Sequence, residues 1–211
     1  MRTTIALPAI TPERTALLAM DFQNGIVSRA PDADALVERV KGAIADGTVG
    51  YVRAAGGTVG YVRVAFTEDD WTAVPDTNKV FSAVAAAKML HHEDPATRID
   101  ERITPEDGDI VVRKIRFGGV STTDLHRQLS ERGIDTLVLA GISTSGVVLS
   151  TLVDVADRDY RVFVLTDGVA DPDPETHRVL VDKVFPSRAH LIDTTRLREL
   201  LRPAATDVRS L

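Results

Sequence analysis

Charged and polar side chains follow three apolar segments of this sequence that are typical of buried strands. Asp21 comes directly after the run at 15–20, and Lys114 ends the run at 109–114. A turn of glycines and hydroxyl residues, 141–147, follows the third run. Because the carboxyl ends of parallel strands share one edge of a sheet, we expect these groups to gather there.

A carboxylate and an ammonium at the ends of neighbouring strands could pair in a dry cleft. Lys114 would favour the ionised form of Asp21, and burial would oppose it. Such competition is common at functional sites, but a plain structural salt bridge produces it too, and the spacing leaves both interpretations open. The turn at 141–147 leads from a strand into a helix, so it presents backbone N–H groups at the same edge.

Strand-like and helix-like patterns alternate about six times along the chain. This alternation predicts an α/β fold, a three-layer sandwich whose mainly parallel sheet of about six strands has helices on both faces. We expect strands at 15–20, 58–66, 109–114, 135–140, 160–167 and 189–193, and helices at 33–55, 79–90, 123–133, 146–158, 175–185 and 195–201.

One hexapeptide, TVGYVR, occurs twice, at 48–53 and 58–63. We expect the first copy to end a helix that stops at Gly56-Gly57 and the second copy to form a strand. The segment 67–78 is polar and holds the only tryptophan, so we expect a loop there.

The predicted organisation is a single domain, because no change of composition marks a second one. We expect an N-terminal arm at 1–14, the domain at 15–202 and a C-terminal tail at 203–211.

The composition excludes several classes of function. The formal charge of −6 argues against binding to nucleic acid or to an anionic membrane surface. The absence of cysteine excludes disulfides, cysteine-based metal sites and a cysteine nucleophile. No signal-peptide pattern and no apolar run of membrane-spanning length are present, so we expect a cytoplasmic location.

Other signals of chemistry are weak. The turn GISTSG is not a phosphate-binding glycine pattern, and the five histidines lack metalloprotease spacing. The HHED segment at 91–94 could bind a metal loosely, although a solvated loop is the favoured interpretation. His126 and His177 fall in helical patterns, and we expect them at the surface.

Three motifs occur in a specific order. They are a strand followed by Asp-Phe-Gln at 19–23, VVRK at 111–114 and AGISTSGVV at 140–148. Together they resemble the isochorismatase-like hydrolase superfamily, which includes nicotinamidases, N-carbamoylsarcosine amidases and isochorismatases. The resemblance runs from about residue 15 to 195. It implies a Rossmann-like parallel sheet flanked by helices.

The resemblance also implies roles for particular residues. In the amidase branch an Asp, Lys and Cys form the functional triad, and the first two positions match Asp21 and Lys114. The cysteine position falls on Val147, and valine cannot attack a carbonyl, so the thiol mechanism is excluded. The family's turn often contains a non-proline cis peptide, which would fall at Ile142-Ser143.

The metal motif and the substrate of two branches are not matched. Nicotinamidases carry Asp-x-His after the second strand, but FTEDDW holds no histidine, so we predict no such metal site and no cofactor. The isochorismatase branch, which uses the aspartate as acid and water as nucleophile, also lacks the cysteine. Val147 is bulkier than the glycine common there and that branch's histidine-containing turn is absent, so isochorismate itself is disfavoured.

The predicted function is hydrolysis of a small organic molecule by acid–base chemistry of Asp21 and Lys114. Two alternatives stay open: a silent ligand-binding or scaffold protein, and an amidase with Ser143 or Ser145 as nucleophile. We expect a homo-oligomer, a dimer or tetramer. The residues expected to bind substrate or an oxyanion are Gln23, Trp71, Arg116, Phe117, Ser143, Thr144, Ser145, Gly146 and Val148.

Overall fold

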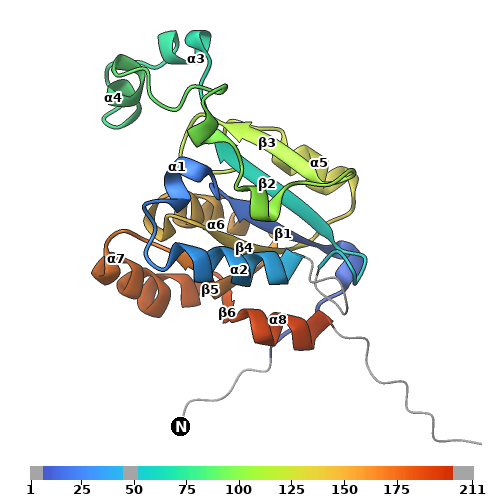
Figure 1. Ribbon diagram of the computed structural model, residues 1–211. Coiled ribbons are helices and arrows are strands. Elements are labelled where there is room, and N and C mark those ends of the chain that lie inside the picture. Colours follow the sequence, from blue (N-terminus) through green and yellow to red (C-terminus); the bar gives the residue numbers. More distant parts are fainter. Residues whose placement is uncertain (1–6, 45–51, 202–211) are drawn as a thin grey trace, which may run out of the picture.

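The computed structural model describes residues 7–44 and 52–201 and shows one parallel sheet with helices on both faces (Figure 1). The order of its strands is β3-β2-β1-β4-β5-β6, and every neighbouring pair is parallel. The predicted fold class is confirmed. The strands are β1 Thr15–Met20, β2 Thr58–Val64, β3 Ile110–Lys114, β4 Thr136–Ile142, β5 Arg161–Ala170 and β6 His190–Ile192.

The two central strands are buried along their whole length, which explains why their sequences are continuous apolar runs. Side chains of β1 alternate between the two faces, with Leu17 in one core and Leu18 in the other. Helices α2 and α8 cover the first face, and α5 and α6 cover the second. The helix bounds are α2 Ala33–Ile44, α5 Leu125–Glu131, α6 Leu149–Ala156, α7 Pro174–Val179 and α8 Thr194–Leu201.

Two short helices after β2, α3 Glu68–Thr72 and α4 Phe81–Ala86, project from the carboxyl edge of the sheet (Figure 1). We call residues 66–92 the arm; this segment is distinct from the N-terminal arm expected at 1–14. It has its own small core, in which Phe66, Phe81 and Val84 pack together. The cluster lies next to the ends of β2 and β3, so the arm can form a wall beside that edge.

Part of the arm differs from the sequence prediction. The segment 67–78 was expected to be a loop, but it contains α3. The side chain of Thr67 accepts a hydrogen bond from the N–H of Asp70, and Asp70 binds the N–H of Thr67 in return, so a reciprocal cap starts the helix. The helix expected at 79–90 is shorter, because α4 ends at Ala86.

Other boundaries differ as well. α2 is described as far as Ile44. Residues 45–51 of the helix expected at 33–55, with most of the first TVGYVR copy, lie outside the described residues, and residues 52–55 form turns where helix was expected. The second copy forms most of β2, as predicted. A short helix, α1 Asn24–Val27, follows Asp21. No helix within 7–44 or 52–201 is long and apolar enough to cross a membrane.

Candidate active site

Asp21 and Lys114 form a buried ion pair at the carboxyl edge of the sheet. The Nζ atom of Lys114 lies 2.8 Å from Oδ2 of Asp21, and the two side chains are 3% and 7% exposed. The two strands were expected to be neighbours. In the structure β2 lies between β1, which precedes Asp21, and β3, which ends at Lys114. The long lysine side chain therefore reaches past the end of β2. Its Nζ also donates to the backbone carbonyl of Arg116 at 3.1 Å.

The backbone turns sharply at Asp21, where φ is 59°. Aspartate is among the few residues that adopt this left-handed conformation with some frequency. The side chain of Gln23 holds the turn in place: its amide group donates to the carbonyls of Val64 and Thr97 at 2.9 and 2.8 Å and accepts from the N–H of Val64 at 2.7 Å. Gln23 therefore uses its polar atoms to anchor the backbone.

The two oxygens of the Asp21 carboxyl group differ in their surroundings. Oδ2 contacts Lys114, whereas Oδ1 is buried and has no hydrogen-bond partner among the described residues. Burial raises the pKa of Asp21 above its ordinary value, and the charge and hydrogen bond of Lys114 oppose this shift only in part. The group therefore keeps its proton at a higher pH than an exposed aspartate does.

A cavity of about 340 Å³ opens above this pair. Its walls are largely apolar, and the exposed Arg29 adds a positive charge at its edge. It is lined by α1 and the loop after it, by the arm, by the turn after β4, and by the ends of β2 and β3 and the segments that follow β3 and β5. The apolar lining residues are Ile26, Ala30, Val64, Val80, Phe81, Val84, Leu90, Phe117, Ile142, Val147 and Pro172.

The turn after β4 continues into a π-helical segment, Thr144–Val148. The peptide bond Ile142-Ser143 is cis, as the resemblance implies. Within the turn, Ser143 Oγ accepts from the N–H of Gly146 at 3.1 Å, and the carbonyl of Ser143 accepts from the N–H of Val148 at 3.2 Å. These amides are therefore engaged inside the turn.

Two residues that sequence reasoning did not assign to the site hold the turn from behind. Oδ2 of Asp171 accepts a hydrogen bond from the N–H of Ser145 at 2.8 Å, and His177 Nδ1 lies 2.8 Å from Thr144 Oγ1. His177, which was expected at the surface, is partly exposed, and its hydrogen bond with this turn was not predicted. Asp171 comes after the strand expected at 160–167. An acidic residue after a strand was the sequence signal that could have placed it in the site.

The structure brings some of the expected site residues to the cavity and leaves others outside it. Trp71 donates from Nε1 to the carbonyl of Met89 at 3.0 Å, and the guanidinium of Arg116 lies 5.4 Å from the ring centre of Phe81. The expected residues that line the cavity are Asp21, Lys114, Phe117, Ser143, Gly146 and Val147, whereas Gln23, Trp71, Arg116, Thr144, Ser145 and Val148 do not.

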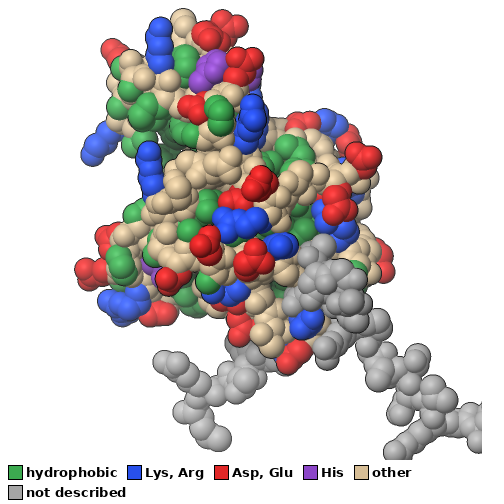
Figure 2. All heavy atoms as spheres, in the orientation of Figure 1, with side chains coloured by type: hydrophobic (Ala, Val, Ile, Leu, Met, Phe, Trp, Pro, Cys, Tyr) green, Lys and Arg blue, Asp and Glu red, His purple; other side chains and the backbone are tan. Residues whose placement is uncertain are grey.

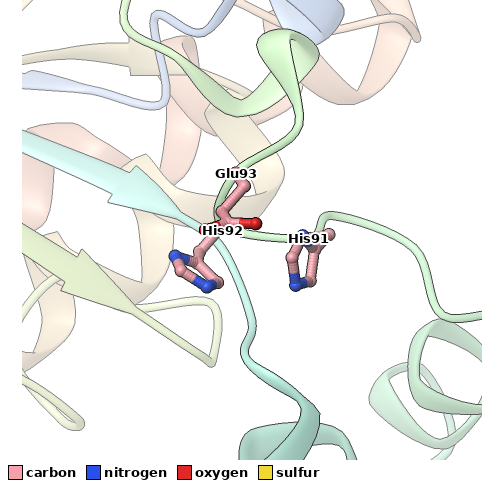
Figure 3. Close-up of side chains that lie close together, drawn as sticks. All are labelled: His91, His92 and Glu93. Atoms are coloured by element: carbon pink, nitrogen blue, oxygen red, sulfur yellow. The ribbon is translucent and has the colours of Figure 1, made fainter.

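One group of side chains among the described residues could hold a metal ion. It comprises His91, His92 and Glu93, which come directly after Leu90 on the arm and on the segment that leaves it (Figure 3). None of the three lines the cavity above Asp21.

Comparison with known proteins places this chain in a family. The isochorismatase domain model matches residues 15–196. An uncharacterized isochorismatase family protein of Bacillus subtilis, YwoC, is 30% identical over 182 residues, covering 82% of this chain and 87% of that protein. The chain therefore belongs to the isochorismatase family, a family of hydrolases, which confirms the predicted resemblance.

Two further comparisons are more limited. Ureidoacrylate amidohydrolase RutB of Methylobacterium radiotolerans is 41% identical over 85 residues, which is 40% of this chain and 33% of that protein. The chain thus spans a third of the length of this relative. A crystal structure of a cysteine hydrolase from Pseudomonas syringae has a TM-score of 0.83 at 22% identity and covers 95% of this chain and 98% of that one. At that identity the likeness shows the fold.

Proposed function

We propose that this chain hydrolyses a small organic molecule by acid–base chemistry of Asp21 and Lys114, without a covalent thiol intermediate. The observation that carries the proposal is the buried pair of Asp21 and Lys114, which lines an apolar cavity; Oδ2 of Asp21 contacts Lys114, and Oδ1 makes no hydrogen bond with any described residue. A polar atom left unbonded in such a place costs free energy, which a substrate or water hydrogen-bonded to it would recover.

In the proposed reaction, Asp21 transfers protons and water is the nucleophile. The carboxylate takes a proton from water, the hydroxyl oxygen bonds to the electrophilic carbon, and the bond to the leaving atom breaks. The leaving atom then receives the proton from Asp21, whose raised pKa suits it to both steps. The ammonium of Lys114 stabilises the negative charge that develops.

Fewer amides in the segment 144–148 are available to bind an oxyanion than the sequence predicted. The amides of Ser145, Gly146 and Val148 already bind Asp171 or Ser143. We therefore assign the role of oxyanion donor to the amide of Val147, which lines the cavity. Val147 itself is 2% exposed and lines the cavity, at the position where the resemblance implies the nucleophile.

The proposed substrate class is a compact amide or ureido compound with an apolar body. The name of the ureidoacrylate amidohydrolase supports the bond type, and the apolar walls support the body of the molecule. A volume of about 340 Å³ is near the lower end of ligand cavities, which favours a small molecule.

The test is turnover of a panel of small amides, ureido acids, esters and enol ethers by the wild-type chain and by Asp21→Asn. We expect Asp21→Asn to lower turnover about 100- to 10,000-fold while the chain stays folded and still binds the substrate. The control is Asp107→Asn, at an exposed position, which should keep full activity. Full activity of Asp21→Asn would refute the proposal.

The two alternatives predict other results. Binding of panel compounds by the wild-type chain without any turnover would favour a silent ligand-binding protein. A serine nucleophile has less support, because Ser145 lies outside the cavity and Ser143 Oγ is already bonded to an amide of its own turn. Labelling of Ser143 by a serine-directed fluorophosphonate, with loss of activity in Ser143→Ala, would favour it.

A further inference from the structure

A second constellation of potential ligands lies at the end of the arm, apart from the Asp21 cavity. One ring nitrogen each from His91 and His92 and one carboxylate oxygen of Glu93 all lie within 4.8 Å of one another (Figure 3). Figure 2 shows histidine and acidic side chains gathered on the arm. Leu90 lines the cavity, but the three side chains after it do not.

A fourth donor comes from a different element. The carboxylate oxygen Oε1 of Glu68, in the first turn of α3, lies 3.2 Å from Nε2 of His91. That nitrogen is shielded from solvent, yet it makes no hydrogen bond with any described residue. Nε2 of His91 and Oε1 of Glu68 are thus 3.2 Å apart without the geometry of a hydrogen bond.

The backbone that carries the two histidines is fixed by the neighbouring segment. His91 forms an isolated parallel β-bridge with Phe66, just ahead of α3. The N–H of His92 donates to the carbonyl of Phe66 at 2.9 Å. The hydroxyl of Thr97 donates to the carbonyl of His91 at 2.9 Å. These bonds hold the segment beside the start of α3 whether or not a ligand is bound, so the donors are brought together in advance.

The only tryptophan of the chain reports on this place. The ring centres of Trp71 and His91 are 5.4 Å apart, and those of His91 and His92 are 4.7 Å apart. Trp71 is fixed through its Nε1–H, which donates to the carbonyl of Met89. A metal ion bound by His91 would therefore lie close to the Trp71 indole.

We propose that His91, His92 and Glu93 bind a divalent cation of the Zn²⁺ type, with Glu68 as a further ligand or as the group that orients His91. Imidazole nitrogens combined with a carboxylate suit zinc and its first-row neighbours, whereas Mg²⁺ and Ca²⁺ prefer oxygen ligands alone. The cation would join α3 to the segment at 91–93 and brace the arm. The proposal is independent of the hydrolase function.

Calorimetric titration of the untagged, chelator-treated full chain with Zn²⁺ tests this site. We expect one equivalent to bind, and at least about tenfold weaker binding in His91→Asn and in His92→Asn. His126→Asn is the matched control, because His126 contacts Tyr160 and should leave the affinity unchanged. Absence of binding, or equal affinity in His92→Asn and in the control, would overturn the proposal.

A second measurement locates the bound ion. Co²⁺ should quench the fluorescence of Trp71, and Zn²⁺ should reverse the quenching by displacement. His92→Asn should lose this quenching while its circular dichroism stays that of the wild type. Stoichiometric Co²⁺ binding that leaves the Trp71 emission unchanged would place the ion elsewhere and refute the assignment.

Discussion

Two consecutive residues of β3, Arg113 and Lys114, each pair with an aspartate but in opposite surroundings. The strand alternates between buried and exposed positions, so the side chain of Lys114 is buried and that of Arg113 faces outward. Lys114 and Asp21 are 3% and 7% exposed, whereas Arg113 and Asp70 are 35% and 19% exposed. One strand thus carries one cation of a buried ion pair and one cation of a partly solvated ion pair.

The pKa values of the two aspartates shift in opposite directions. Burial opposes ionisation of both, but it prevails only at Asp21, where the pKa is raised. At Asp70 the hydrogen bonds from the N–H and hydroxyl of Thr67 and from Arg113 outweigh burial, and the pKa is lowered. A cation beside a carboxylate therefore does not fix its protonation; the balance of burial and hydrogen bonds does.

The largest expected effect is on stability when each cation is removed. Lys114→Met leaves the charge of Asp21 buried without a partner, so we expect the free energy of unfolding to fall by about 3–5 kcal/mol. Arg113→Met leaves Asp70 its bonds to Thr67 and partial solvation, and we expect a loss of about 1 kcal/mol or less. Urea unfolding at pH 7 measures both. Equal losses would show that burial does not distinguish the pairs.

The next effect is the pH dependence of stability, where the two aspartates should act with opposite sign. The unfolded chain releases the Asp21 proton near the ordinary value of 3.8, while the native chain keeps it to higher pH. The native state then binds more protons in that window, so Asp21 lowers the free energy of unfolding as pH rises through its native pKa. Asp21→Asn should remove this decrease.

Asp70 should contribute in the opposite sense. Its native pKa lies below the ordinary 3.8, so its stabilisation is present above that value and is lost as pH falls through the native pKa. Asp70→Asn should make the chain less sensitive to acid. Urea midpoints between pH 3 and 8 for both variants test the signs, and a decrease above pH 4 that persists in Asp21→Asn would contradict the assignment.

The sequence was sufficient for the sheet and for the two ends of the buried pair. β1 is buried on both faces, so its apolar run is continuous and the charge of Asp21 that follows it stands out; Lys114 ends the half-buried strand β3. That Lys114 reaches across β2 was not predictable, because strand order depends on tertiary packing. The contact of His177 with Thr144 joins residues far apart in sequence, which a local pattern cannot show.

The arm shows a different kind of limit. The reciprocal cap of Thr67 and Asp70 has a local signature, Thr-x-x-Asp, that could have predicted α3. By contrast, nothing in the apolar pattern around α4 indicates that Val80, Phe81 and Val84 line the cavity. The apolar pattern predicts that α4 has an apolar face, but it does not predict what that face contacts. Hence the charged floor of the cavity was found from sequence and most of its apolar wall was not.

The smallest expected effect separates charge from shape within the two pairs. Arg113 donates from one nitrogen to both Asp70 and the carbonyl of Ala65, the latter at 2.8 Å, so Arg113→Lys keeps the charge and loses this shared contact. Because the pair is partly solvated, we expect a loss of stability of about 0.5 kcal/mol and unchanged turnover.

Lys114→Arg keeps the charge too, but it places a larger guanidinium at the floor of the cavity and should lower turnover. Urea unfolding and panel turnover of the two variants check this order. If Arg113→Lys lowered turnover as much as Lys114→Arg, the site would depend on the outer pair as well, and the contrast between them would fail.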